Sequence, residues 1–138
     1  MEGISVEMND YSGNKKITVI SVKGQLDTTT AHALEDQLKL ALQDKKFNLI
    51  IELKDVDYIS SAGWGIFISE LKRIRTAKGD LVLAGMKPEV SEIFELLEFN
   101  RIIKSFDDLE NAAMKAFPNL PKATRVAKGL RPLFSTEG

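Results

Sequence analysis

Three polar side chains in this sequence combine residue type and position in a way that suits phosphate chemistry. Ser60 and Ser61 follow the apolar run 49–53 and open a helical pattern of apolar residues, and Asp27 follows an earlier β-rich run. A serine at the start of a helix can cap it, and its hydroxyl lies beside free backbone N–H groups and the positive end of the helix dipole. Such a position tolerates a phosphate.

Asp27 occupies a position that corresponds to that of the serines, after the end of a strand and before a helix. In an open α/β sheet such positions share one rim, where a carboxylate could orient a serine by hydrogen bonding or hold Mg²⁺ for an incoming phosphate. The plainer interpretations are a turn residue for Asp27 and a helix cap for Ser61. The sequence leaves both pairs of interpretations open.

The residues after Ser61 divide between packing and partner contact. Gly63 lies four positions before Phe67 on the inward stripe, which predicts close packing of helix against sheet. Gly65 lies elsewhere on the helix, where an absent side chain could admit a partner, and packing is the plainer interpretation of both glycines. Trp64 is either an aromatic residue at the edge of the core or an exposed anchor for another protein.

Composition narrows the range of functions. The 138 residues include no cysteine, which excludes disulfides and cysteine catalysis, and the single histidine, His32, cannot form a metal site alone. No apolar run approaches the ~20 residues that span a bilayer, and residues 1–10 lack the layout of a signal peptide, so we expect a cytoplasmic protein. A net charge of −1 argues against a direct nucleic-acid binder.

Motifs typical of enzymes are missing from the sequence. It has no Gly-Lys-Ser/Thr phosphate loop, no Gly-x-Gly-x-x-Gly after a strand and no nucleophile elbow. We therefore expect a binding or switch module that is not an enzyme and has no cofactor or metal site. A small enzyme or nucleotide binder that uses Asp27 and Ser61 is the weaker alternative.

The order of the predicted elements indicates the fold class. Apolar patterns predict strands at 4–8, 17–22, 48–53 and 81–84 and an edge strand at 102–103, with a linker at 54–59. Helices are predicted after residues 28–30, from 61 to about 77, from Pro88 and after residues 107–108. This order predicts an α/β fold with a mixed, mostly parallel sheet of about five strands and about four helices.

The chain has two regions of different composition. Residues 1–116 are expected to form one domain, and residues 117–138 a Pro/Gly-containing extension that begins at Phe117. The charged residues of the extension are almost all basic, namely Lys122, Arg125, Lys128 and Arg131 against Glu137. The extension is either a solvated surface segment or an element that reaches an acidic partner or anionic surface.

The element order and three stretches of sequence resemble the STAS domain family, and within it the single-domain anti-sigma factor antagonists. The resemblance covers residues 4–116, and its carriers are residues 24–27 with Thr30–Ala31, residues 53–65, and residues 88–90 continuing to 96–99. In that family the junction commonly reads Asp-Ser-Ser/Thr-Gly-Leu-Gly. The resemblance therefore puts Ser61 at the phosphoacceptor and Ser60 at the usual aspartate, Ala62 at the second hydroxyl and Trp64 at the leucine, and both glycines match.

The resemblance implies a phosphorylation-controlled partner switch. The unphosphorylated chain would bind an anti-sigma factor serine kinase and free its sigma factor or other client, phosphorylation at Ser61 would abolish binding, and a metal-dependent serine phosphatase would reset the switch. Ser60 is a second candidate acceptor. The implied partner-binding residues are Asp27, Thr28, Ser60, Gly63, Trp64 and Gly65, with Asp27 aiding nucleotide-linked recognition by the kinase.

One alternative stays within the same family. In it the chain is a non-switching structural or sensory STAS module of a larger signalling or transporter assembly, and Ser61 is only a helix cap. The identity of the bound partner distinguishes this module from the antagonist.

Overall fold

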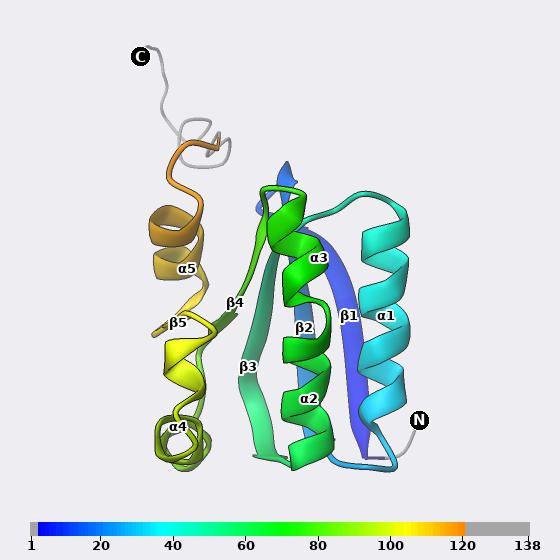
Figure 1. Ribbon diagram of the computed structural model, residues 1–138, viewed down its shortest axis with the longest axis vertical. Coiled ribbons are helices and arrows are strands. Elements are labelled where there is room, and N and C mark those ends of the chain that lie inside the picture. Colours follow the sequence, from blue (N-terminus) through cyan, green and yellow to red (C-terminus); the bar gives the residue numbers. More distant parts are fainter. Residues whose placement is uncertain (1–2, 121–138) are drawn as a thin grey trace.

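One five-stranded sheet organises the computed structural model, which describes residues 3–120 (Figure 1). The strand order is β1-β2-β3-β4-β5, with β1 antiparallel to β2 and all other neighbours parallel. The bounds are β1 (Ile4–Tyr11), β2 (Asn14–Leu26), β3 (Asn48–Ile59), β4 (Asp80–Ala84) and β5 (Ser105–Phe106). The predicted α/β class with a mixed, mostly parallel sheet is confirmed.

Helices cover both faces of this sheet. α1 (Ala31–Gln43), α2 (Ser61–Ser69) and α3 (Leu71–Thr76) lie on one face, and α5 (Leu109–Ala116) lies on the other (Figure 1). α4 (Pro88–Leu96) and the 3₁₀ turn η1 (Phe99–Arg101) complete the set. In Figure 1, α4 lies at the lower end of the molecule, where β3 ends and α2 begins.

Alternate side chains of the central strands face two separate cores. Leu49 and Ile51 of β3 pack toward α1, α2 and α3. Ile50 packs with Val19 and Ala113 on the α5 side of the sheet. Because both faces are covered, the strand sequences at 48–53 and 81–84 are apolar almost without interruption, as the sequence pattern indicated.

β3 runs through the segment 54–59, which we predicted to be a linker. Val56 and Ile59 are buried, and the parallel pairing with β2 continues to the pair Leu26 and Ile59. The register shifts twice along this part of β2, between Ser21 and Lys23 and between Gly24 and Gln25. Such irregularities preserve pairing while they break the strict alternation of side chains, so the local sequence pattern did not indicate a strand.

Two further elements differ from the predictions. The helix expected from 61 to about 77 is interrupted at Glu70 and forms α2 and α3. β5 lies at 105–106 and not at 102–103, because Ile103 is buried in the core after η1 and the Ile102 carbonyl accepts a hydrogen bond from the Arg75 guanidinium at 2.7 Å. That bond ties the turn to the end of α3.

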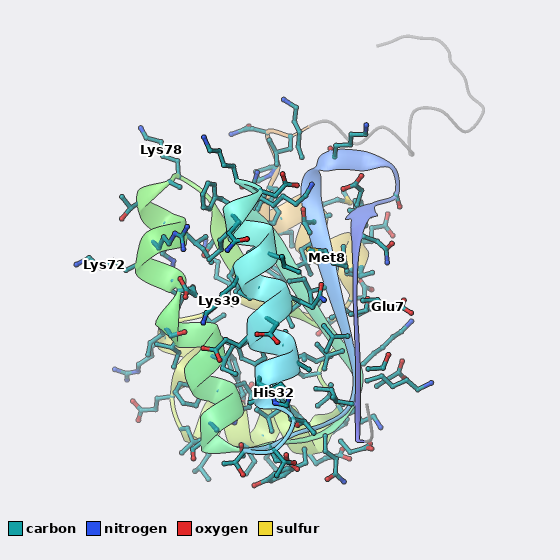
Figure 2. All side chains as sticks on the ribbon, turned by 90° about the vertical axis from the view of Figure 1, so that its right-hand side faces the viewer. Glu7, Met8, His32, Lys39, Lys72 and Lys78 are labelled. Atoms are coloured by element: carbon teal, nitrogen blue, oxygen red, sulfur yellow. The ribbon has the colours of Figure 1, made fainter. Side chains whose placement is uncertain are left out.

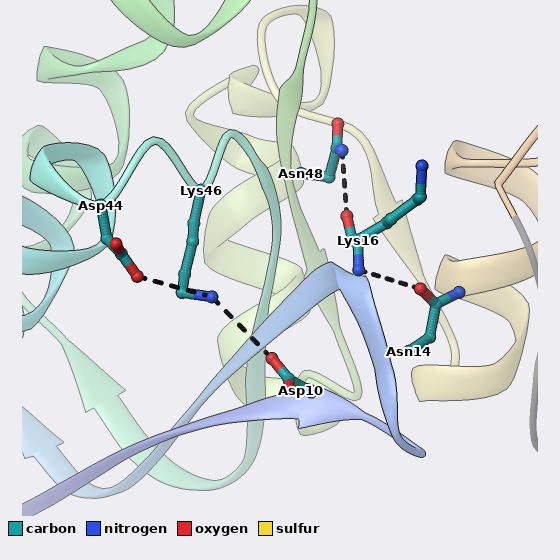
Figure 3. A network of polar contacts seen from close by, with 6 residues as sticks. All are labelled: Asp10, Asn14, Lys16, Asp44, Lys46 and Asn48. Carbon is teal, nitrogen blue, oxygen red and sulfur yellow. Dashed lines mark hydrogen bonds and ion pairs between the residues drawn. The ribbon is translucent and has the colours of Figure 1, made fainter.

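Polar contacts secure the end of the sheet that lies farthest from Ser61 (Figure 3). The ammonium group of Lys46 lies 3.7 Å from the Asp44 carboxylate and 4.0 Å from that of Asp10. The Asn48 side chain donates to the Lys16 carbonyl at 3.0 Å. These contacts fasten the β1–β2 hairpin to the start of β3. The residues at the opposite rim, near Ser61, take no part in them.

The described packing continues past the predicted domain boundary at residue 116. Phe117 is buried in the α5 core and Leu120 packs against the same cluster, so the packed part includes the first residues of the predicted extension. Residues 121–138, the rest of that extension, lie outside the described residues. Within 3–120, no helix has the length and apolar character that crossing a membrane requires.

Candidate functional site

The carboxyl ends of β2 and β3 bring the two predicted loops to one rim. The strands pair to their last residues, Leu26 and Ile59, and the N–H of Ser60 donates to the Leu26 carbonyl at 2.8 Å. The loop with Asp27 and the start of α2 therefore leave the sheet side by side. Figure 2 shows the first turns of α1 and α2 at the same end, with His32 marking α1. The predicted shared rim is confirmed.

The two serines have different structural roles. Ser60 is the N-cap of α2, with extended backbone angles (φ −81°, ψ 173°), and its Oγ accepts a hydrogen bond from the Gly63 N–H at 3.3 Å. Ser61 is the first helical residue and is exposed, and none of the side-chain hydrogen bonds found in residues 3–120 uses its hydroxyl. The cap is therefore Ser60, and the interpretation of Ser61 as the cap is wrong.

The position of Ser61 is electrostatically favourable for an anion. α2 has nine residues, so its aligned peptide dipoles place partial positive charge at the turn that contains Ser61. The backbone N–H groups of its first turn have no acceptor within the helix, and the Ser60 hydroxyl satisfies that of Gly63. A phosphate on Ser61 would lie beside these groups, so the modification need not oppose the fold.

Gly63 and Gly65 face in opposite directions. A Cβ on Gly63 would lie 2.9 Å from side-chain atoms of both Leu26 and Ile59, so this glycine permits the close helix-to-sheet contact that the sequence predicted. Gly63 is buried and cannot touch a partner directly, which corrects the contact role that the resemblance implied for it. Gly65 is exposed, with no other atom within 4 Å of the place that a Cβ would take.

Trp64 belongs to the core. Its side chain is 2% exposed, and its ring lies 5.6 Å from that of Phe94 and 5.3 Å from that of Phe99. Phe67 meets it edge to face, with the ring centroids 5.9 Å apart. The exposed-anchor interpretation is wrong, because these aromatic contacts hold α2 against α4 and η1 and cover the indole. Trp64 therefore supports the site from beneath.

The Asp27 carboxylate accepts hydrogen bonds from residues of its own loop. Its Oδ1 accepts from the Thr29 hydroxyl at 2.7 Å, from the Thr29 N–H at 2.9 Å and from the Thr30 N–H at 3.1 Å. These bonds, led by the one from the Thr29 hydroxyl, hold the pKa of Asp27 below its ordinary value. Thr28 is exposed in the same loop. The carboxylate is thus kept ionised and shapes the loop that starts α1.

The structure does not support the two chemical roles that the sequence left open for Asp27. Within residues 3–120, no hydrogen bond joins Asp27 to Ser60 or Ser61. In the same part of the chain, no group of three or more histidine, aspartate or glutamate side chains is placed to hold a metal ion. Asp27 therefore shares the rim with the serines without orienting them.

A groove of about 530 Å³ opens beside Ser61, and we call it the α2–α4 groove. The end of β3, the start of α2 and one side of α4 form its walls. Tyr58, Ile93 and Leu97 line it and remain 52%, 43% and 51% exposed. Its other lining residues are Ile59, Ser60, Ser61, Trp64, Val90 and the carboxylates Asp57, Glu89 and Glu92.

One ion pair joins the walls of the α2–α4 groove. The Lys87 ammonium, at the N-cap of α4, pairs with the Asp57 carboxylate of β3. The hydrogen bond to Asp57 is the main reason why the pKa of Lys87 is raised above its ordinary value, and the negative charges of Glu89 and Asp55 act in the same direction. The charged residues that line the α2–α4 groove, Asp57, Glu89 and Glu92, are all acidic, and the Lys87 ammonium lies beside them.

The groove could not be predicted from the sequence, because the spacing of Val90, Ile93, Phe94 and Leu97 fits one buried face of a helix. The structure buries Val90 and Phe94 and leaves the other two partly exposed. The available signal was an excess of apolar positions in a helix of nine residues, since one face cannot cover them all.

The amino-acid sequence is similar to that of a known domain family and of known proteins. The STAS domain family model matches residues 9–112. BtrV of Bordetella bronchiseptica, named as a candidate anti-sigma factor antagonist, is 31% identical over 104 residues, which cover 75% of this chain and 90% of BtrV.

Two solved structures share the fold. An anti-sigma factor antagonist from Mycobacterium paratuberculosis superposes with a TM-score of 0.73 at 23% identity, covering 82% of this chain and 93% of that one. The phosphorylated form of the Bacillus cell fate determinant SpoIIAA superposes with a TM-score of 0.62 at 16% identity, covering 80% and 97%.

The first prediction concerns the serine that caps α2. Ser60→Ala removes the acceptor of the Gly63 N–H and should lower the free energy of unfolding by about 1 kcal/mol. Ser61→Ala removes an unbonded hydroxyl and should change it by less than about 0.5 kcal/mol. Urea unfolding of both variants measures the difference, and Ser60→Asp, which retains a capping oxygen, is the control. A larger loss in Ser61→Ala would contradict the assignment.

The second prediction concerns the pH dependence that Asp27 contributes. Because its pKa is lowered in the folded state from 3.8, ionised Asp27 stabilises the fold above that pH, and the contribution is lost as the pH falls through the lowered pKa. The stability difference between wild type and Asp27→Ala should thus be constant above about pH 5 and shrink in stronger acid. Urea unfolding of both proteins at a series of pH values across this range measures the stability difference. The difference should not vary with pH if Asp27 is not engaged as described.

Proposed function

Because this chain belongs to the STAS domain family, we propose that it is an anti-sigma factor antagonist that works as a phosphorylation-controlled partner switch. The family makes it a non-enzymatic regulator, and its relatives carry the antagonist name. Its partner in the proposal is an anti-sigma factor serine kinase that holds a sigma factor or another client. Unphosphorylated, the chain binds the kinase and frees the client in the cytoplasm.

The observation that carries this proposal is the division of roles between the two serines. Ser60 uses its hydroxyl to cap α2, whereas Ser61 next to it is exposed and has no side-chain hydrogen bond in the described part of the chain. An acceptor for a kinase must be reachable and must not be needed by the fold. Ser61 meets both conditions, and Ser60 meets neither fully. A relative of the same fold was solved in a phosphorylated form.

The exposed face of α2 suits close contact with a partner. Ser61, Gly65 and Ser69 follow one another at four-residue spacing and are all exposed, so small residues line one side of the helix. A partner helix or loop can approach this backbone closely. In the proposal this stripe, together with Asp27 and Thr28 on the neighbouring loop, forms the docking surface, with Asp27 aiding nucleotide-linked recognition by the kinase.

Phosphorylation would end this contact through charge and hydration. A phosphoserine adds about −1.5 to −2 charges and a strongly hydrated group at the centre of the surface. Glu89 already adds negative charge to this rim, so the phosphate increases the repulsion of an acidic partner surface, and its hydration shell opposes close packing by any partner. The helix dipole stabilises the same phosphate within the chain, so the switch acts on the interface and not on the fold.

A metal-dependent serine phosphatase completes the proposed cycle by restoring the Ser61 hydroxyl. The competing candidate is a non-switching STAS module of a larger signalling or transporter assembly. Both share the fold and differ in what Ser61 does, so phosphate incorporation decides between them.

The third prediction locates the phosphate. After incubation with ATP and a serine kinase of the anti-sigma type, intact-mass spectrometry should find one added phosphate on the wild type and none on Ser61→Ala. Ser60→Asp removes the other hydroxyl while retaining the cap, and it should still accept one phosphate. Site mapping that finds the phosphate on Ser60, or no phosphate with any such kinase, would favour the non-switching module.

The fourth prediction tests the docking surface. Gly65→Gln adds a side chain to an exposed helix position where no atom obstructs it, so folding should be unimpaired or slightly improved. Binding to the kinase should nevertheless weaken by about tenfold, or ~1.4 kcal/mol, because close approach is blocked.

Thr76→Gln, at an exposed position on the last turn of α3, is the matched control. It should leave the affinity unchanged in isothermal titration calorimetry. Equal affinity for wild type and Gly65→Gln would mean that the partner binds elsewhere.

A further inference from the structure

The α2–α4 groove has features of a binding surface for a basic, partly apolar peptide. Tyr58, Ile93 and Leu97 line it and remain about half exposed, so three apolar side chains face solvent together at one place. Asp57, Glu89 and Glu92 line the same groove. Of these, Asp57 has a counter-ion in Lys87, while no ion pair within residues 3–120 neutralises Glu89 or Glu92.

Residues 121–138 of this chain have the complementary chemistry. The segment carries Lys122, Arg125, Lys128 and Arg131 with only Glu137 against them, and it interleaves these with Val126, Leu130, Leu133 and Phe134. We propose that this segment docks in the α2–α4 groove of its own chain, with its apolar side chains on Tyr58, Ile93 and Leu97 and its basic side chains at the acidic rim.

The length of the segment is sufficient for this docking. The last described residue, Leu120, packs with the α5 core that includes Ile50, near the start of β3, whereas the groove lies beyond Ile59 at the opposite end. From Ile50 to Ile59 the strand rises about 30 Å at ~3.3 Å per residue. The ten to fourteen residues that separate Leu120 from Leu130 and Phe134 extend over roughly 33–46 Å.

Figure 1 shows the same separation. Residues 117–120 lie at the upper end of the molecule, above α5, and α4 lies at the lower end. The chain between Leu120 and residues 130–134 is therefore long enough to span the distance to the groove.

Docking there would regulate access to Ser61, which lines the same groove. A segment docked in the groove competes with any partner that binds at this rim. The docking itself needs no kinase, whereas this regulatory consequence rests on the proposed function. Neutralising the basic residues should then raise the rate of Ser61 phosphorylation.

Paramagnetic NMR on the full chain tests the docking without kinase or ATP. The natural sequence has no cysteine, so Ser135→Cys carries a single nitroxide label next to Phe134. The label should reduce the amide signals of Ala62, Val90 and Ile93 and the indole signal of Trp64, the only tryptophan. Signals of Lys39 and Lys72, which Figure 2 shows away from this rim, should keep their intensity.

A matched pair of variants tests the charge complementarity. Glu92→Lys reverses a charge that lines the groove, and Glu95→Lys reverses an exposed charge on the same helix that does not line it. The label should weaken the groove signals much less in Glu92→Lys than in the wild type, and nearly as much in Glu95→Lys. Its effect should also become smaller as the salt concentration rises.

Two results would overturn the proposal. One is a label that leaves the groove signals unchanged or reduces signals elsewhere instead. The other comes from a mixture of isotope-labelled wild type and spin-labelled chains without isotope enrichment. If the groove signals weaken there as much as they do when the label is on the same chain, the segment in the groove belongs to a second copy. Absence of phosphorylation at Ser61 would refute the proposed switch and leave the docking result standing.

Discussion

The parallel pairing of β2 with β3, carried to the last residue of each strand, is the constraint on which the site depends. It brings Leu26 beside Ile59, and the Ser60 N–H closes the end of the ladder on the Leu26 carbonyl. Gly63 can then pack against both strand ends, because it has no Cβ to hold the helix away. Two loops that are far apart in sequence become one rim, and α2 begins at a fixed height above it.

Within this arrangement neighbouring residues of one helical turn perform separate tasks. Ser60 caps the helix, Ser61 presents a hydroxyl that makes no side-chain hydrogen bond within residues 3–120, and Gly63 and Trp64 pack beneath. Gly65 then leaves open backbone on the exposed side. This separation lets a modification change what the surface binds without changing what holds the helix, which is what a reversible switch requires.

The aromatic contacts of Trp64 determine the second half of the site. They hold α4 close enough to α2 to form a groove, yet α4 is too short to bury every apolar residue that it carries. Ile93 and Leu97 therefore remain at the surface, next to carboxylates and directly beside Ser61. An apolar surface with an acidic rim at this place links the accessibility of the serine to whatever occupies the groove.

Local patterns in the sequence predicted the types of the main elements, their order along the chain, the shared rim and the packing role of Gly63. The continuation of β3 to Ile59, the capping role of Ser60, the burial of Trp64 and the groove beside Ser61 became visible in the folded chain. The reason is physical. Turn chemistry, capping propensity and apolar periodicity act over a few residues, whereas burial and pairing at a strand end depend on which distant elements cover them.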